Sequence, residues 1–182
     1  AQVWEDWKSQ LALYGEDNLT IGAEETSSGT VTVRGLGLRV SDDEVTATTT
    51  MEAITFNEQS DGSVRVTMDE SYPVIITGAD GVVVTVMVGQ QNMETIVSGE
   101  PDAMNYDIKV GQYTIALKDV VDGDLTFTGD AEVAMNDVDL TYESKVNEMR
   151  EMSYSGTVGS VDVLVDFQIP GGDSEYVTGG GK

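Results

Sequence analysis

The sequence predicts an all-β, strongly β-dominated domain: a long curved antiparallel meander whose apolar face is capped by an N-terminal amphipathic helix. Three observations predict it. First, the 182 residues include 25 Val and 19 Thr, types that fit a pleated, half-buried surface, often in alternation. Second, Gly, Asp and Asn stand at frequent corners between these stretches. Third, one N-terminal segment has helical periodicity instead.

The N-terminal helix is expected at about residues 3–14. Apolar side chains recur there in steps of three and four residues, from Val3 to Tyr14, and charged side chains take the opposite face. Gly15 follows as a typical stop signal. Trp4 and Trp7 both lie on the apolar stripe, so we expect the helix to cover the sheet with its indole rings buried.

Beyond the helix, about a dozen strands are expected, separated by turn signals. The clearest are residues 31–40, 45–56, 64–68, 82–88, 94–97, 106–110, 113–120, 124–128, 133–142 and 161–169. Asp-Gly pairs at 61–62, 80–81 and 122–123 indicate hairpin turns. The run 82–88 is apolar on both faces, which is typical of a central strand covered on each side. Such short connections predict sequential antiparallel pairing.

The alternation changes parity at three points, which are Gly35, the neighbourhood of Ala53, and residues 136–137. A residue inserted at a change of parity is typical of a β-bulge, and bulges supply the bends that strong curvature requires. A long meander with one apolar face must close on itself, pack on a second sheet, or cover that face with a helix or an apolar ligand.

The chain is expected to form one domain over residues 1–169. Apolar residues at an i, i+3 spacing indicate a short second helix at 143–152. After Pro170 the composition becomes rich in glycine, so residues 170–182 are expected to be a tail or linker.

The charge of the chain excludes several partners. It has 33 acidic and 9 basic residues, a net charge of -24, so we expect no nucleic acid, whose phosphates need Lys and Arg. No apolar run is long enough for a membrane-spanning helix. The chain starts with Ala1-Gln2, which suits a start left by removal of a signal peptide. We therefore expect a periplasmic or extracellular location, which a lack of cysteine does not oppose.

The residue types also limit the chemistry. Without histidine or cysteine, imidazole bases, thiols and His/Cys metal sites are excluded. Acidic clusters at 42–44, 122–130 and 136–139 lack the spacing of an EF-hand loop, and turn chemistry and solvated strand faces account for them. Ser144-Lys145 is a candidate dyad on a polar stretch that we expect to face water. We predict no enzyme, no metal and no cofactor.

The eight methionines are spread over nearly every expected strand. Methionine adapts its shape, so it suits either irregular core packing or an adaptable apolar groove, and both interpretations stay open. Five residues on apolar parities of long strands are candidates to line one shared concavity for an apolar ligand: Met51, Met68, Val86, Val163 and Val165. A curved, aromatic-poor apolar face of this kind suits acyl chains.

Three segments carry a resemblance to a known family: VWEDWKSQLALYG near the start, SGEPDAMNYDI at 98–108 and EMREMSYSGTVGS at 148–160. They resemble an uncharacterised secreted protein family of Gram-negative alphaproteobacteria, which is distantly similar to AsmA-like envelope proteins. The resemblance implies β-sheets that form lipid-holding grooves, and a chain that is the N-terminal part of a longer protein. It implies no functional residues.

The function predicted from these observations is a non-enzymatic cell-envelope protein that binds an apolar ligand, a lipid being favoured, in the concavity of its sheet. The alternative is a structural or interaction module of the periplasm or cell surface whose core is filled by its own side chains. The interior distinguishes them, because a lipid carrier needs an open apolar groove and a structural module packs to normal density.

Overall fold

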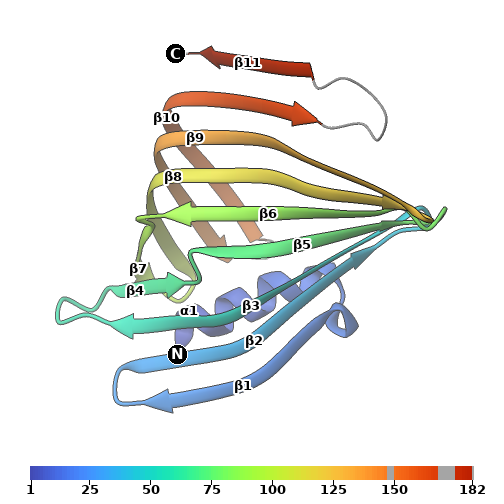
Figure 1. The fold of residues 1–182 in the computed structure, drawn as a ribbon. Helices are drawn as coiled ribbons and strands as arrows, with labels where there is room; N and C mark the ends of the chain where they lie inside the picture. Colours follow the sequence, from blue (N-terminus) through green and yellow to red (C-terminus); the bar gives the residue numbers. More distant parts are fainter. Residues whose placement is uncertain (147–149, 168–174, 182) are drawn as a thin grey trace.

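The computed structural model describes residues 1–146, 150–167 and 175–181, which form one 11-stranded antiparallel sheet and an N-terminal helix (Figure 1). The elements are α1 (Gln2–Leu11), two 3-10 turns (Ala12–Tyr14 and Glu16–Asn18), β1 (Leu19–Ser27), β2 (Thr30–Ser41), β3 (Val45–Glu58), β4 (Val64–Met68), β5 (Ser71–Gly78), β6 (Val83–Gln91), β7 (Glu94–Glu100), β8 (Ala103–Asp122), β9 (Leu125–Val146), β10 (Arg150–Phe167) and β11 (Glu175–Gly181). The predicted fold class is confirmed.

The middle of the sheet is split between two long strands, β3 and β8. β4 pairs with the last residues of β3, and β5 pairs with its first residues. In the same way, β7 pairs with the first part of β8 and β6 with its second part. The order therefore departs from a plain meander, because β4 pairs with β7, and β5 with β3, rather than with each other. Long strands make this split possible, since each offers two partners room along one edge.

A bend crosses β1 to β3 at Gly35, where the sequence predicted a change of parity. Gly35 has a φ of 60°, a conformation that glycine adopts without the steric cost of a Cβ, and by register it lies opposite Gly22. Val33 before the bend and Leu36 after it are both buried. Leu36 pairs with Met51, which also packs against the core, so the bend keeps the apolar side chains of both strands on one face.

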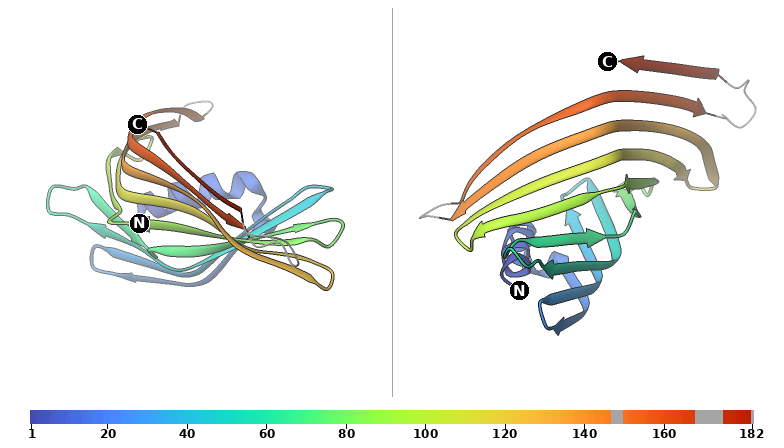
Figure 2. Two further views of the ribbon diagram at one scale, coloured as in Figure 1. Left: turned by 45° about the horizontal axis from the view of Figure 1, so that its top comes forward. Right: turned by 90° about the vertical axis from the view of Figure 1, so that its left-hand side faces the viewer.

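A second bend crosses β8 to β10. The predicted irregularity at 136–137 is confirmed, because Asp137 has a φ of 52°. The strand register places Gly111 of β8 and Gly159 of β10 opposite Asp137, one on each side. Two glycines and a left-handed aspartate in line let three adjacent strands bend together, and Figure 2 shows these strands arching over the helix.

The core lies between α1 and one half of the concave side of the sheet (Figure 2). Its largest fully buried side chains include Trp4 of the helix with Phe56, Ile54, Val33 and Val66 of β2 to β4. The buried members of the cluster and the side chains packed on them come from α1, β1 to β4, β7, β8 and β9. The prediction that the helix covers the sheet is therefore confirmed.

The boundaries of the helices differ in part from the prediction. The α-helix ends at Leu11, and a 3-10 turn continues to Tyr14 before Gly15, whose φ is 107°. The predicted second helix at 143–152 is wrong. Residues 143–146 belong to β9, where 143–145 pair with β8. Residues 150–152 belong to β10 and pair with 144–146 of β9. Residues 147–149 lie outside the described part of the chain.

Two further predictions meet a different outcome at β11 and β6. Residues 175–181 of the expected glycine-rich tail form β11, which pairs with β10. Backbone groups alone can complete an edge, so a glycine-rich segment needs no apolar side chains to do so. β6 is an internal strand between β5 and β8, but most of its apolar side chains are half-buried rather than covered on each side.

Candidate functional site

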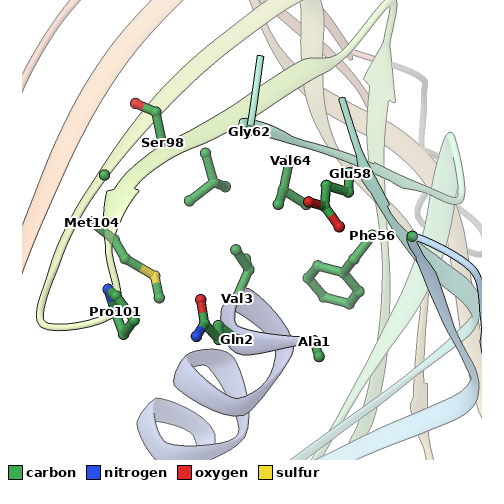
Figure 3. Close-up of a pocket in the computed structure, with 13 residues that line it drawn as sticks. Ala1, Gln2, Val3, Phe56, Glu58, Gly62, Val64, Ser98, Pro101 and Met104 are labelled. Carbon is green, nitrogen blue, oxygen red and sulfur yellow. The ribbon is translucent and has the colours of Figure 1, made fainter. Parts of the chain in front are cut away.

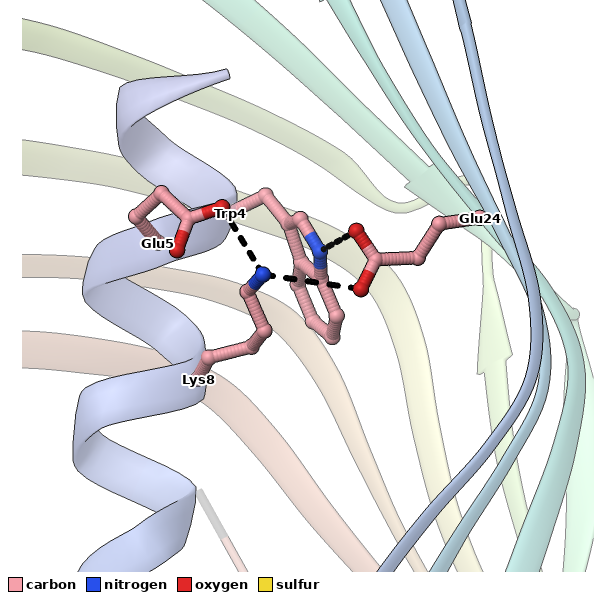
Figure 4. A network of polar contacts seen from close by, with 4 residues as sticks. All are labelled: Trp4, Glu5, Lys8 and Glu24. Atoms are coloured by element: carbon pink, nitrogen blue, oxygen red, sulfur yellow. Dashed lines mark hydrogen bonds and ion pairs between the residues drawn. The ribbon is translucent and has the colours of Figure 1, made fainter.

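The helix is fixed to β1 by a polar cluster around the buried ring of Trp4 (Figure 4). The Trp4 Nε1–H donates to Glu24 Oε2 at 2.8 Å. Lys8 Nζ lies 2.8 Å from Glu5 Oε1 and 3.5 Å from Glu24 Oε1, and 5.3 Å from the centroid of the indole ring. Its hydrogen bond with Glu5 raises the pKa of the Lys8 ammonium. The carboxylate of Glu24 thus satisfies the one polar atom of the buried indole.

A second polar group ties the helix to β8 and β9. The Tyr106 hydroxyl and the Gln10 amide both donate to Asp6 Oδ2, at 2.9 Å and 2.7 Å, and the Tyr142 hydroxyl donates to Gln10 Oε1 at 3.2 Å. Burial, and then the Asp6 carboxylate, raise the pKa of Tyr106 well above its usual range. Tyr106 therefore stays a neutral donor, and the buried Asp6 side chain is held by its hydrogen bonds with Tyr106 and Gln10.

Two hollows flank the helix. One of about 310 Å³ lies at its N-terminal end, where Val3, Phe56, Val64 and Met104 meet (Figure 3). The other, of about 220 Å³, lies between the helix and β8 and β9, and its lining includes Trp7, Leu11 and Ile108 beside the two tyrosines. Trp7 and Leu11 are half-buried there, so the apolar side of the helix forms one wall of this second hollow and the sheet forms the other.

The face of the sheet that contacts the helix, here called the inner face, can be followed by register beyond the helix. Thr49 lies two residues from Met51 and therefore on the same face. From Thr49 a row of paired residues crosses the sheet through Val74, Val86, Leu117, Ala131 and Val165. Neighbouring rows on the same face contain Ile76, Val84 and Val120, and Ile115, Val133 and Val163.

These eleven residues of β5, β6, β8, β9 and β10 are here called the uncovered apolar face. Within the described residues, β5, β6 and β10 contribute nothing to the core under the helix. Most of the exposed large apolar side chains among the described residues lie on the inner face: Val40, Val45, Ile115, Leu125, Val133, Val146, Met152, Tyr154, Val158 and Val163. Ile75 and Leu164 are exposed on the other face, and Leu13 in the 3-10 turn.

The opposite face is mixed: it carries a polar ladder across β8 to β10, together with apolar residues such as Ile75, Met87 and Leu164. Gln112 Nε2 donates to Asn136 Oδ1 at 3.0 Å, and Asn136 Nδ2 donates to Asp162 Oδ2 at 2.8 Å. This ladder runs across β8, β9 and β10 on the parity that alternates with Ile115, Val133 and Val163. The inner face differs because it is apolar over several adjacent strands, which is typical of a surface that is buried against a partner.

The five residues predicted as a ligand site all lie on the inner face, in two groups. Met51 and Met68 are half-buried and pack against the core beneath the helix. Val86, Val163 and Val165 lie on the uncovered apolar face, with Val163 40% exposed. The two methionines thus contribute to the core of the domain, and the three valines remain accessible.

The structure adds residues that the sequence did not single out. Ile115, Leu117 and Val133 belong to strands predicted as two shorter pieces each, so their place in a continuous face was hidden. Tyr72 lies on the same parity as Val74, and burial, together with Tyr113, raises its pKa to about 12. The change of parity at residue 137 was a signal that could have found them. In β9 the odd-numbered residues before Asp137 face inward, and in β8 the odd-numbered residues between Gly111, which lies opposite Asp137, and the register shift after Leu117 do the same.

The candidates for catalysis and metal binding do not assemble. Ser144 is buried on the inner face and not water-facing as expected, whereas Lys145 pairs with Glu143 at 3.4 Å on the outer face. Successive strand residues point to opposite faces, so a Ser-Lys dyad is wrong here. Among the described residues, no group of three or more acidic side chains is placed to hold a metal ion. No helix in this part of the chain is long and apolar enough to cross a membrane.

Comparison of the chain with protein-family models, with curated proteins and with solved structures found no match.

Proposed function

We propose that this protein is a non-enzymatic binding protein that holds an apolar ligand, with a lipid favoured, along the uncovered apolar face. One observation carries the proposal, which is that the exposed apolar side chains gather on the concave face beyond the helix. A large contiguous apolar surface on a monomer is typical of an interaction site, since leaving it in water costs free energy.

The shape of this face favours a flexible chain over a compact ligand. The row from Thr49 to Val165 crosses several strands at about 4.8 Å per strand, which gives an apolar path of more than about 20 Å. Aliphatic side chains line it without the convergent polar groups that orient a small polar substrate.

The second candidate function is a structural or interaction module, and the helix-covered half of the sheet favours it. There the protein fills its concavity with its own Trp4 and Phe56, whose ring centroids are 5.7 Å apart. In that case the uncovered apolar face would meet another protein. A cell-envelope location and a distant relationship to AsmA-like proteins remain parts of the proposal that the sequence resemblance motivates.

Val163 and Leu164 provide a matched test of the ligand proposal. They are neighbours in β10 with 40% and 43% exposure, but Val163 lies on the inner face and Leu164 on the outer face. Val163→Asp places a charge in the path of an apolar chain, and Leu164→Asp places the same charge in water. We expect Val163→Asp to weaken binding of an uncharged fluorescent alkyl probe by about tenfold or more, because an unpaired charge against hydrocarbon costs several kcal/mol.

Leu164→Asp should bind the probe like the unchanged protein, and both variants should keep the β-type far-ultraviolet circular dichroism of the sheet. Probe binding that is absent in the unchanged protein, or equally weakened by both substitutions, would contradict the proposal and favour the structural module.

A further inference from the structure

The uncovered apolar face contains no charged side chain. Its rows from Val74 to Val165, from Ile76 to Val120 and from Ile115 to Val163 consist of aliphatic residues. Polar side chains of the inner face beside these rows include Thr49, which pairs with Val74, and Tyr72 and Tyr113, which interact with each other. A charged head group could find no partner within these rows, and burying it unpaired costs several kcal/mol. If an amphiphile binds here, its head group must lie at an end of the face.

Three hairpin turns meet at one end of this face, at the tips of β2–β3, β5–β6 and β8–β9 (Figure 1). Their contact is direct, because the Ala79 N–H donates to the Glu44 carbonyl oxygen at 2.7 Å, and Val83 pairs with Val121. This end is here called the acidic rim. Its exposed acidic residues are Asp42, Asp43, Glu44, Asp80, Asp122 and Asp124. The turn segments 42–44, 79–82 and 123–124 contain no Lys or Arg.

The rim adjoins the apolar rows. Val45, Val84 and Val120 lie within a few residues of the acidic turns, well within the distance of about 10 Å over which charges act at moderate salt. The whole chain adds to the same field with its net charge of -24. An anionic head group at this rim would therefore be repelled, and a cationic head group would be attracted.

From this charge complementarity we infer that the ligand is an amphiphile whose head group presents a positive charge at the acidic rim while its hydrocarbon chain lies along the uncovered apolar face. The inference rests on the proposed function, and it specifies the class of ligand. The apolar rows bind the chain, and the rim selects among head groups.

Three probes with the same dodecyl chain test the inference: dodecyltrimethylammonium, dodecyl maltoside and dodecanoate, each below its micelle concentration. Each competes with the uncharged fluorescent alkyl probe for the protein. At low ionic strength we expect dodecyltrimethylammonium to bind about tenfold or more tightly than dodecanoate, with the affinity of dodecyl maltoside between the two. In about 1 M salt the difference should nearly vanish, because screening then acts within about 3 Å.

Two triple variants locate the selectivity. Asp43→Asn with Glu44→Gln and Asp124→Asn removes three charges from the rim. Asp42 and Asp80 are kept, because their carboxylates accept the backbone hydrogen bonds that hold two of the turns. The control removes three charges near the other end of β8 and β10, by Glu100→Gln, Asp102→Asn and Glu151→Gln. Both variants have the same net charge.

The rim variant should lower the ratio of cationic to anionic affinity by severalfold more than the control variant does. Equal affinity for all three probes, or an equal change in both variants, would overturn the inference and leave the proposed function standing. Failure of every probe to bind would overturn the proposed function as well.

Discussion

Replacement of Trp4 by alanine tests how the helix is held on the sheet. Trp4 is 1% exposed, its ring packs on Phe56, and its Nε1–H donates to Glu24. Removal of a buried tryptophan side chain costs about 3–5 kcal/mol through lost apolar burial and the cavity that remains. The lost hydrogen bond adds about 1 kcal/mol at most, because Glu24 can be rehydrated. We expect Trp4→Ala to lower the free energy of unfolding by about 3–5 kcal/mol.

Urea unfolding followed by far-ultraviolet circular dichroism measures this change, since the signal comes from the sheet rather than from the indole. Leu13→Ala is the matched control, because Leu13 is 76% exposed and its loss should change stability by less than about 0.5 kcal/mol. A loss below about 1 kcal/mol for Trp4→Ala would refute the reasoning, because it would mean that the helix is not part of the cooperative core.

Three further predictions concern single groups. Thr95→Val should raise the free energy of unfolding by about 1 kcal/mol in urea titrations, because the buried Thr95 hydroxyl has no hydrogen-bond partner among the described residues; destabilisation would contradict this. The raised pKa of Tyr106 means that the folded state holds its proton more tightly than the unfolded state, so stability should fall as the pH rises above about 10, less steeply in Tyr106→Phe. Gly35→Ala should cost about 1–2 kcal/mol from its φ of 60°, and Gly35→Asn less; equal stability of both variants would show that the bend does not require this conformation.

Local patterns in the sequence predicted the elements but not all of their partners. The spacing of Trp4 and Trp7 predicted the helix, and the parity changes at Gly35 and residue 137 predicted the bends. The split pairing of β3 and β8 was not predicted, because alternation shows which face a residue takes and not which strand lies beside it. The first half of β10 was also missed, since Ser153, Ser155 and Gly156 weaken the pattern there.

The candidate site was predicted in part for the same reason. Alternation placed Val163 and Val165 on an apolar parity, and the register confirms that they share a face with Val86. The part of the inner face that the helix covers depends on the length of the helix relative to the width of the sheet. No local pattern in the sequence gives the width of the sheet. The sequence therefore could not separate Met51 and Met68, which lie under the helix, from the valines beyond it.

The central claim, that a hydrocarbon chain lies along the uncovered apolar face, is tested most directly by methyl nuclear magnetic resonance with an uncharged nitroxide-labelled alkyl chain. Ile115, Val133 and Val163 are exposed on the inner face, and Ile75 and Leu164 are exposed to a similar extent on the outer face. A bound nitroxide should broaden the methyl signals of the first three at a much lower ratio of probe to protein than those of Ile75 and Leu164, because the effect falls steeply with distance. Equal broadening on both faces, or none on either, would contradict the claim.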